Sequence, residues 1–168
     1  MGKFLIPIII LFATLYGCNS EGCLENGSAI PLAGFYSSST EKQISLNILQ
    51  IHGCDSPADN DSILVKTGEN VSEVYLPMRS TRSSTMWALT YNQNGLKNPH
   101  DTINFEYESI PYFASEECGA MYYYRITNLN YTKNLIDSVT LTETLITNAD
   151  IETIKIFFRT AAEGGSKK

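Results

Sequence analysis

Two histidines and four cysteines are the side chains of this sequence best suited to nucleophilic chemistry. His52 lies two residues before Cys54, so within one β-strand the two side chains share a face, and a thiol there could pass its proton to the imidazole. The sequence offers no evident third residue to orient the imidazole, and it contains no G-x-S-x-G nucleophile elbow. His100 stands among Asn, Pro and Asp residues, which are typical of a surface turn. We therefore predict that the protein is not an enzyme, and a hydrolase is the third of three hypotheses.

The densest group of oxygen ligands is the acidic segment Asp55, Asp59 and Asp61. Read as a calcium loop from Asp55, the segment has Pro57 at the third position and Lys66 where the closing Glu should stand. These departures exclude an EF-hand and leave only a weak candidate for Ca²⁺. A solvated loop between strands is the favoured interpretation, and the sequence predicts no metal and no cofactor.

Aromatic residues form the third group with binding chemistry. In a strand that contains Tyr122, Tyr123 and Tyr124, the outer two share one face and Tyr123 points to the other. If one face is core, an outward Tyr123 near Trp87 or Tyr91 could stack on sugar rings, which makes a glycan-binding module the second hypothesis. A half-buried tyrosine with its hydroxyl in water is the simpler interpretation.

The first 18 residues predict where the protein is located. Lys3 is followed by an apolar run, Phe4 to Tyr16, which is shorter than the roughly 20 residues that span a membrane and suits a signal peptide. The run ends in Leu-Tyr-Gly-Cys, which resembles a lipobox, the processing site of bacterial lipoproteins. We therefore expect lipid at Cys18 and attachment to the cell envelope through acyl chains. The residue after Cys18 is Asn19, not the Asp that retains some lipoproteins in the inner membrane. We therefore expect the protein in the outer membrane.

Length and charge limit the remaining choices. The whole chain has 12 basic and 18 acidic side chains, and removal of the leader leaves a net charge near −7. Such a chain lacks the Lys/Arg clusters that bind phosphate, which argues against nucleic acid as a partner. The mature length suits one domain. We predict four parts: signal peptide 1–17, lipidated Cys and tether 18–28, folded domain 29–160 and polar tail 161–168.

Period-two alternation predicts the elements of that domain. Apolar residues alternate with polar ones around Ile44–Ile48, Ile103–Tyr107 and Val139–Leu141, and a similar pattern covers Ile154–Phe158. Segments rich in β-branched and aromatic residues supply further candidates at 30–36, 62–66, 71–78, 85–91 and 121–127. No window shows a capped helical period. The sequence predicts an all-β, antiparallel, sandwich-like domain or partly open barrel of eight or nine strands.

The order of these segments resembles an uncharacterised family of small Bacteroidetes lipoproteins, classified only as a domain of unknown function. The resemblance covers residues 18 to about 159. Its most specific piece is Ser-Glu-Glu-Cys-Gly at 115–119, before an aromatic strand, and Ile-Lys-Ile-Phe-Phe at 154–158 closes the domain. The resemblance implies a cell-envelope β protein with no known activity. We therefore expect a binding or structural role.

With Cys18 lipidated, three pairings of Cys23, Cys54 and Cys118 are open. The resemblance implies a Cys23–Cys118 disulfide, because those two cysteines belong to the family pattern and Cys54 does not. Closing so long a loop contributes about 4–5 kcal/mol in the chain-entropy model.

Three tripeptides match a short Asp-Ser/Thr-aliphatic pattern that resembles Bacteroidetes O-glycosylation acceptors. Their hydroxyl residues are Ser62, Thr102 and Ser138. Such tripeptides also arise wherever a strand begins after an acidic turn, so the prediction depends on the source organism.

Overall fold

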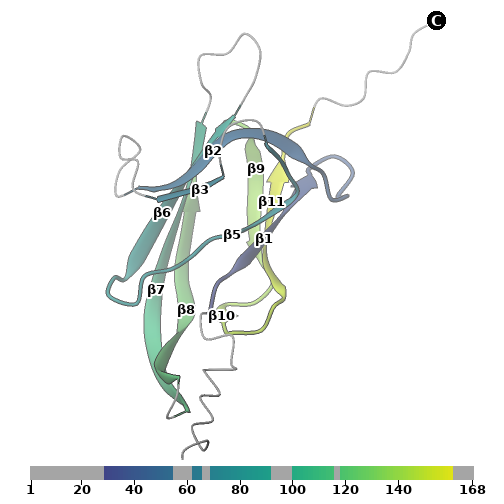
Figure 1. Ribbon diagram of the computed structural model, residues 1–168. Helices are drawn as coiled ribbons and strands as arrows, with labels where there is room; N and C mark the ends of the chain where they lie inside the picture. Colours follow the sequence, from purple (N-terminus) through teal and green to yellow (C-terminus); the bar gives the residue numbers. More distant parts are fainter. Residues whose placement is uncertain (1–28, 55–61, 66–68, 92–99, 116–117, 161–168) are drawn as a thin grey trace, which may run out of the picture.

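A computed structural model of the chain describes residues 29–54, 62–65, 69–91, 100–115 and 118–160 (Figure 1). These residues form eleven strands and no helix, which confirms the predicted all-β class. The strands are β1 Leu32–Ser37, β2 Leu46–Cys54, β3 Ser62–Val65, β4 Glu69–Val71, β5 Glu73–Tyr75, β6 Ser84–Tyr91, β7 His100–Ser115, β8 Gly119–Tyr131, β9 Ile136–Leu141, β10 Leu145–Ile146 and β11 Glu152–Phe158. No described segment forms a helix long and apolar enough to cross a membrane.

The strands form two sheets that face each other. One has the order β5-β1-β11-β9, and the other has the order β10-β8-β7-β6-β2-β3, with β4 also paired to β2. Figure 1 shows β2 arching over one end of the molecule from the smaller sheet to the larger one. An antiparallel bridge between Tyr36 of β1 and Gln43 marks where the chain leaves the smaller sheet. The larger sheet is thereby curled, and the domain has the form of a half-barrel, consistent with the predicted sandwich-like architecture.

One pairing departs from the predicted antiparallel arrangement. β1 and β11 lie side by side and run parallel, with Phe35 opposite Ile156. Parallel neighbours need a long connection, and here the connection is nearly the whole domain, since β1 is its first strand and β11 its last. Local alternation cannot reveal such a contact, because it depends on residues more than a hundred positions apart.

The core lies between the two sheets and is largely aromatic. Phe35 and Phe158 are fully buried and meet edge to face, with ring centroids 5.2 Å apart. Tyr91 reaches across from the larger sheet and contacts Phe158 in the same manner at 6.1 Å. Each large ring buries roughly 150–250 Å² of surface, so these contacts connect the smaller sheet firmly to the larger one.

Candidate binding surface

The hairpin of β7 and β8 continues well beyond the half-barrel. β6 pairs with β7 only from His100 to Glu106, whereas β8 follows β7 as far as Ser115. The last part of the hairpin is therefore a two-stranded ribbon, and Figure 1 shows it projecting from the end of the molecule opposite the arch of β2. Pro111 lies in this part, where β7 has no partner among the described strands on its other side. This position suits a residue that has no backbone N–H to donate.

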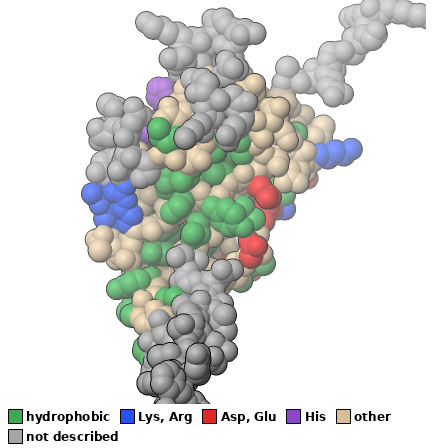
Figure 2. Space-filling view, viewed as in Figure 1, with side chains coloured by type: hydrophobic (Ala, Val, Ile, Leu, Met, Phe, Trp, Pro, Cys, Tyr) green, Lys and Arg blue, Asp and Glu red, His purple; other side chains and the backbone are tan. Residues whose placement is uncertain are grey.

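The inner face of the ribbon exposes apolar side chains. Along β7 the buried residues Phe105 and Tyr107 face the core, and after a register shift the same face continues outward without an opposing sheet. Phe113 is 70% exposed there, and Tyr122 on β8 is 36% exposed. Figure 2 shows hydrophobic side chains at the surface along the side where the hairpin lies. We call this surface the apolar shelf; it consists of Pro111, Phe113, Ala120 and Tyr122.

A groove of about 370 Å³ adjoins the apolar shelf. Tyr122 and Tyr124 of β8 form one wall, and Met78 and the segment that begins at Ala29 form the other. The Tyr124 hydroxyl donates to the Met78 carbonyl across the inner end at 3.4 Å. The point where the described chain begins therefore lies against the base of the projecting hairpin.

The outer face of the ribbon is held by side-chain contacts. The rings of Tyr112 and Tyr123 stack with centroids 4.0 Å apart and planes 22° apart. The Tyr112 hydroxyl also contacts the Met121 sulfur at 3.5 Å, and the Tyr123 hydroxyl donates to Asn148 Oδ1 at 3.5 Å. An isolated two-stranded hairpin is marginal in water, so these contacts stabilise the ribbon where the second sheet does not reach.

The described residues of the ribbon carry no formal charge. The segments 109–115 and 118–124 contain no Lys, Arg, Asp or Glu. The first charged pair inward is Arg125 with Glu108, 3.3 Å apart and exposed. The chemistry that the ribbon offers is therefore aromatic and apolar contact.

The predicted stacking platform of Trp87, Tyr91 and Tyr123 is not formed. Trp87 and Tyr91 are each 3% exposed, because both point from β6 into the core, and neither presents a ring face to solvent. Tyr123 is half-buried on the outer face, as predicted, but one face of its ring is occupied by Tyr112. The exposed aromatic residues are instead Phe113 and Tyr122, which sequence reasoning missed because it placed one whole face of each strand in the core.

The residues with nucleophilic chemistry are largely shielded from solvent, although they lie on the face of β2 opposite the core residue Ile51. His52 and Cys54 of β2 are 5% and 4% exposed, and Cys54 carries a buried thiol. Cys54 lines a pocket of about 270 Å³ together with Met86 and Trp87, but so little of either side chain is exposed that the geometry gives little support to a Cys/His nucleophile. His100 is exposed at the start of β7, in keeping with a surface residue.

The other predicted sites are described only in part. Asp55, Asp59 and Asp61 lie outside the described residues, as do Cys18 and Cys23, and within the described ranges no cluster of His, Cys, Asp or Glu could hold a metal. The lipid attachment and the Cys23–Cys118 pairing therefore stay predictions.

The three acceptor hydroxyls of the glycosylation pattern also stay predictions. Thr102 and Ser138 are half-buried on β7 and β9, and the side chain of Ser62 lies outside the described atoms. Asp101, which precedes Thr102, is fully buried, so an enzyme that reads its side chain cannot reach it in the folded domain.

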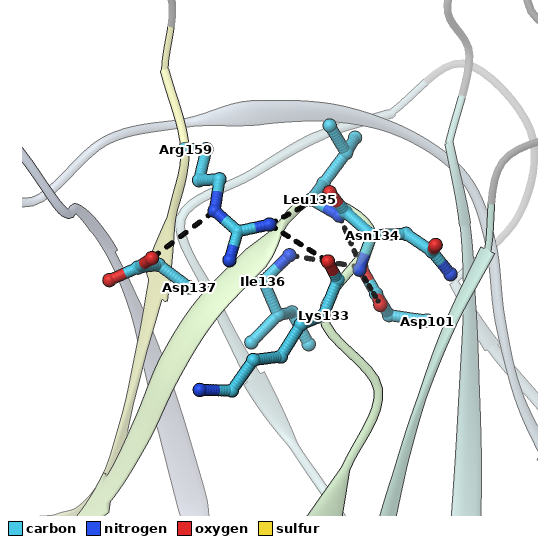
Figure 3. A network of polar contacts seen from close by, with 7 residues as sticks. All are labelled: Asp101, Lys133, Asn134, Leu135, Ile136, Asp137 and Arg159. Atoms are coloured by element: carbon cyan, nitrogen blue, oxygen red, sulfur yellow. Dashed lines mark hydrogen bonds and ion pairs between the residues drawn. The ribbon is translucent and has the colours of Figure 1, made fainter.

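Asp101 instead belongs to a polar cluster that closes the opposite end of the domain (Figure 3). Its carboxylate accepts hydrogen bonds from the backbone N–H groups of residues 134, 135 and 136 at 2.7–3.0 Å and from the hydroxyls of Tyr91 and Thr132. Arg159 binds the same connection from its carbonyl side, with Nη1 2.8 Å from the Lys133 oxygen. The two side chains thus satisfy both kinds of backbone group in the turn from β8 to β9.

These features define an all-β half-barrel with one projecting aromatic hairpin. A model of a family of unknown function (DUF6452) matches residues 46–158, which is about two thirds of the chain, and the chain belongs to this family. The match includes strands β7 and β8 and the polar cluster of Asp101 except for Arg159. Neither the curated proteins nor the solved structures contain a match to the chain.

Proposed function

We propose that the protein is a lipid-anchored cell-envelope protein whose role is binding rather than catalysis. The observation that carries this proposal is the apolar shelf, where Phe113 is 70% exposed on a ribbon whose described residues carry no charge. Exposed aromatic residues gathered on one projecting element are typical of interaction sites, whereas isolated surface apolar residues are not. The burial of His52 and Cys54 also favours binding over catalysis, because only 5% and 4% of these two nucleophilic candidates is exposed.

Lipid attachment at Cys18 accounts for the proposed location of the protein in the cell envelope. The short apolar leader followed by Leu-Tyr-Gly-Cys supports processing to a mature chain that begins with a lipidated cysteine. Asn19 at the next position favours the outer membrane. A Cys23–Cys118 disulfide would join the tether to the outer end of the ribbon, because Cys118 directly precedes Gly119, which pairs with Ser115.

Labelling and crosslinking test the two parts of the proposal. A clickable palmitate analogue should label the wild-type chain and fail to label Cys18→Ser. A photo-crosslinking amino acid at position 113 should form adducts in intact envelopes. The matched control is position 63, because Ile63 is also an exposed apolar residue, at 53%, and lies on β3. Equal adduct formation at both positions would refute a binding role for the shelf.

A glycan-binding module is the second candidate function. Tyr122 supports it, since the ring is partly exposed beside a groove of a size that could take one sugar unit. Isolated envelope polysaccharide should then retain the wild type and release Tyr122→Ala. Retention that does not change in Tyr122→Ala would exclude this site.

A further inference from the structure

We propose that the apolar shelf is a membrane-contact surface, so that Phe113 and Tyr122 of the β7–β8 ribbon lie in the lipid interface beside the anchor. This inference rests on the proposed lipid attachment and names the partner of the shelf: a neutral phospholipid surface. Phe113 and Tyr122 are its principal contacts. Aromatic side chains favour the boundary between hydrocarbon and headgroups, where an apolar ring can be buried while a hydroxyl stays wet.

The position of Ala29, where the described part of the chain begins, places the apolar shelf at the anchored end of the domain. Ala29 lines the groove beside Tyr122, and it follows Cys18 by eleven positions. An extended chain of that length spans at most about 36–40 Å. The ribbon from Ser109 to Ser115 is about 20 Å long at roughly 3.3 Å per residue. The tether is therefore long enough for the apolar shelf to reach the bilayer and too short for the domain to move far away.

The charge of the chain favours contact with neutral lipid over anionic lipid. Segments 109–115 and 118–124 carry no cationic residue that could bind an anionic headgroup, and the chain as a whole has a net charge of −6. Glu116 and Glu117 stand in the sequence between these segments and add to the repulsion. Contact is thus driven by apolar burial, and it should weaken as anionic lipid is added.

The register of the sheet supplies a matched control. Ile63 pairs with His52, His52 pairs with Ala88, and Ala88 pairs with Thr102 of β7. Ile63 is therefore level with a position eleven residues before Phe113, or about 36 Å from it along the strand direction. A probe at position 63 has similar exposure but lies far from the proposed contact.

Tryptophan quenching by brominated lipid tests the proposal. The acylated mature chain, which begins at Cys18, is reconstituted into brominated phosphatidylcholine vesicles as wild type, Phe113→Trp and Ile63→Trp. Trp87 is the only native tryptophan and is buried, so the wild type gives a low background. We expect at least twofold stronger quenching of the added tryptophan at 113 than at 63, and a decrease of that difference when phosphatidylglycerol is included at low salt.

The outcomes separate the two proposals. Vesicle flotation and the mass of the N-terminal peptide report the anchor independently of the apolar shelf. Flotation with equal quenching at 113 and 63 overturns the membrane contact and leaves the anchor in place. If flotation fails, the anchor proposal fails, and the same variants carrying an N-terminal hexahistidine are captured on nickel-chelating vesicles to test the apolar shelf alone. If envelope glycan fragments protect the tryptophan of Phe113→Trp from acrylamide and brominated lipid does not quench it, the shelf belongs to a glycan instead.

Discussion

The two halves of β7 place similar apolar residues in opposite environments, one buried and one exposed. From Asp101 to Tyr107 the strand lies between β6 and β8, and every second side chain is buried under the smaller sheet. From Ser109 to Ser115 it pairs with β8 alone, and Phe113 on the same face is 70% exposed. The comparison shows that alternation specifies which side chains share a face. Whether that face becomes core or surface depends on the presence of an opposing sheet.

The largest expected loss of stability follows from removal of the Asp101 carboxylate in the inner half of β7. Asp101→Ala leaves several buried donors without an acceptor, each costing about 1–3 kcal/mol, so the free energy of unfolding should fall by on the order of 3–5 kcal/mol. Urea denaturation followed by Trp87 fluorescence measures the loss, and Asp101→Asn provides a milder variant if the alanine variant does not fold.

Asp137→Ala is the control for this prediction. Asp137 also bonds to Arg159, at 3.2 Å, but both side chains are 46% exposed, so the loss should be below about 1 kcal/mol. Similar losses for Asp101→Ala and Asp137→Ala would show that burial does not distinguish the two carboxylates.

The next largest expected effect is a loss of folding stability at alkaline pH. Burial, followed by the nearby Asp101 carboxylate and the hydrogen bond to it, raises the pKa of Tyr91 far above its ordinary value of 10.0. The unfolded chain therefore loses this proton at lower pH than the folded domain, so stability is fully present below pH 10 and falls as pH rises above it. The slope is at most about 1.4 kcal/mol per pH unit for this group.

Urea denaturation at a series of pH values measures that slope. Tyr91→Phe should be less stable at neutral pH, because it lacks the hydrogen bond to Asp101, yet it should lose less stability above pH 10. Tyr36, Tyr75 and Tyr124 also have raised pKa values, so some slope should remain. A slope that is unchanged in Tyr91→Phe would assign the alkaline loss to those residues.

Sequence reasoning reached the fold more fully than the site. Alternation correctly located strands that overlap 44–48, 103–107, 139–141 and 154–158, because period two is a local property. It missed the extension of β7 through Pro111, since proline normally argues against a strand, and only the absence of a neighbour on one side makes it acceptable. It also placed Trp87 and Tyr91 near the surface, because the sequence does not show which face of β6 meets the smaller sheet.

A smaller loss of stability, confined to the outer half of β7 and β8, is expected when the Tyr112–Tyr123 contact is removed. Tyr112→Ala removes the stack on Tyr123, and such aromatic pairs contribute about 0.5–1.5 kcal/mol. Because the ribbon can open without unfolding the half-barrel, the loss should appear as faster amide hydrogen exchange in residues 109–115 and 119–124. Exchange within β11 should be unchanged. A double-mutant cycle with Tyr123→Ala isolates the pair, and a coupling near zero would mean that the ribbon is held by its backbone alone.

The smallest expected effect, that of Phe113→Ala, gives the sharpest test of the comparison, because Phe105 offers the same residue type on the same face of the same strand. Phe105 is fully buried and Phe113 is 70% exposed. Phe105→Ala should lower the free energy of unfolding by about 3–5 kcal/mol through lost burial and the cavity left behind. Phe113→Ala should change it by less than about 0.5 kcal/mol, since the ring has few contacts to lose. Urea denaturation in the absence of lipid measures both. A loss above about 2 kcal/mol for Phe113→Ala would mean that the ring is packed within the domain, and the apolar shelf would then be part of the core rather than a surface for a partner.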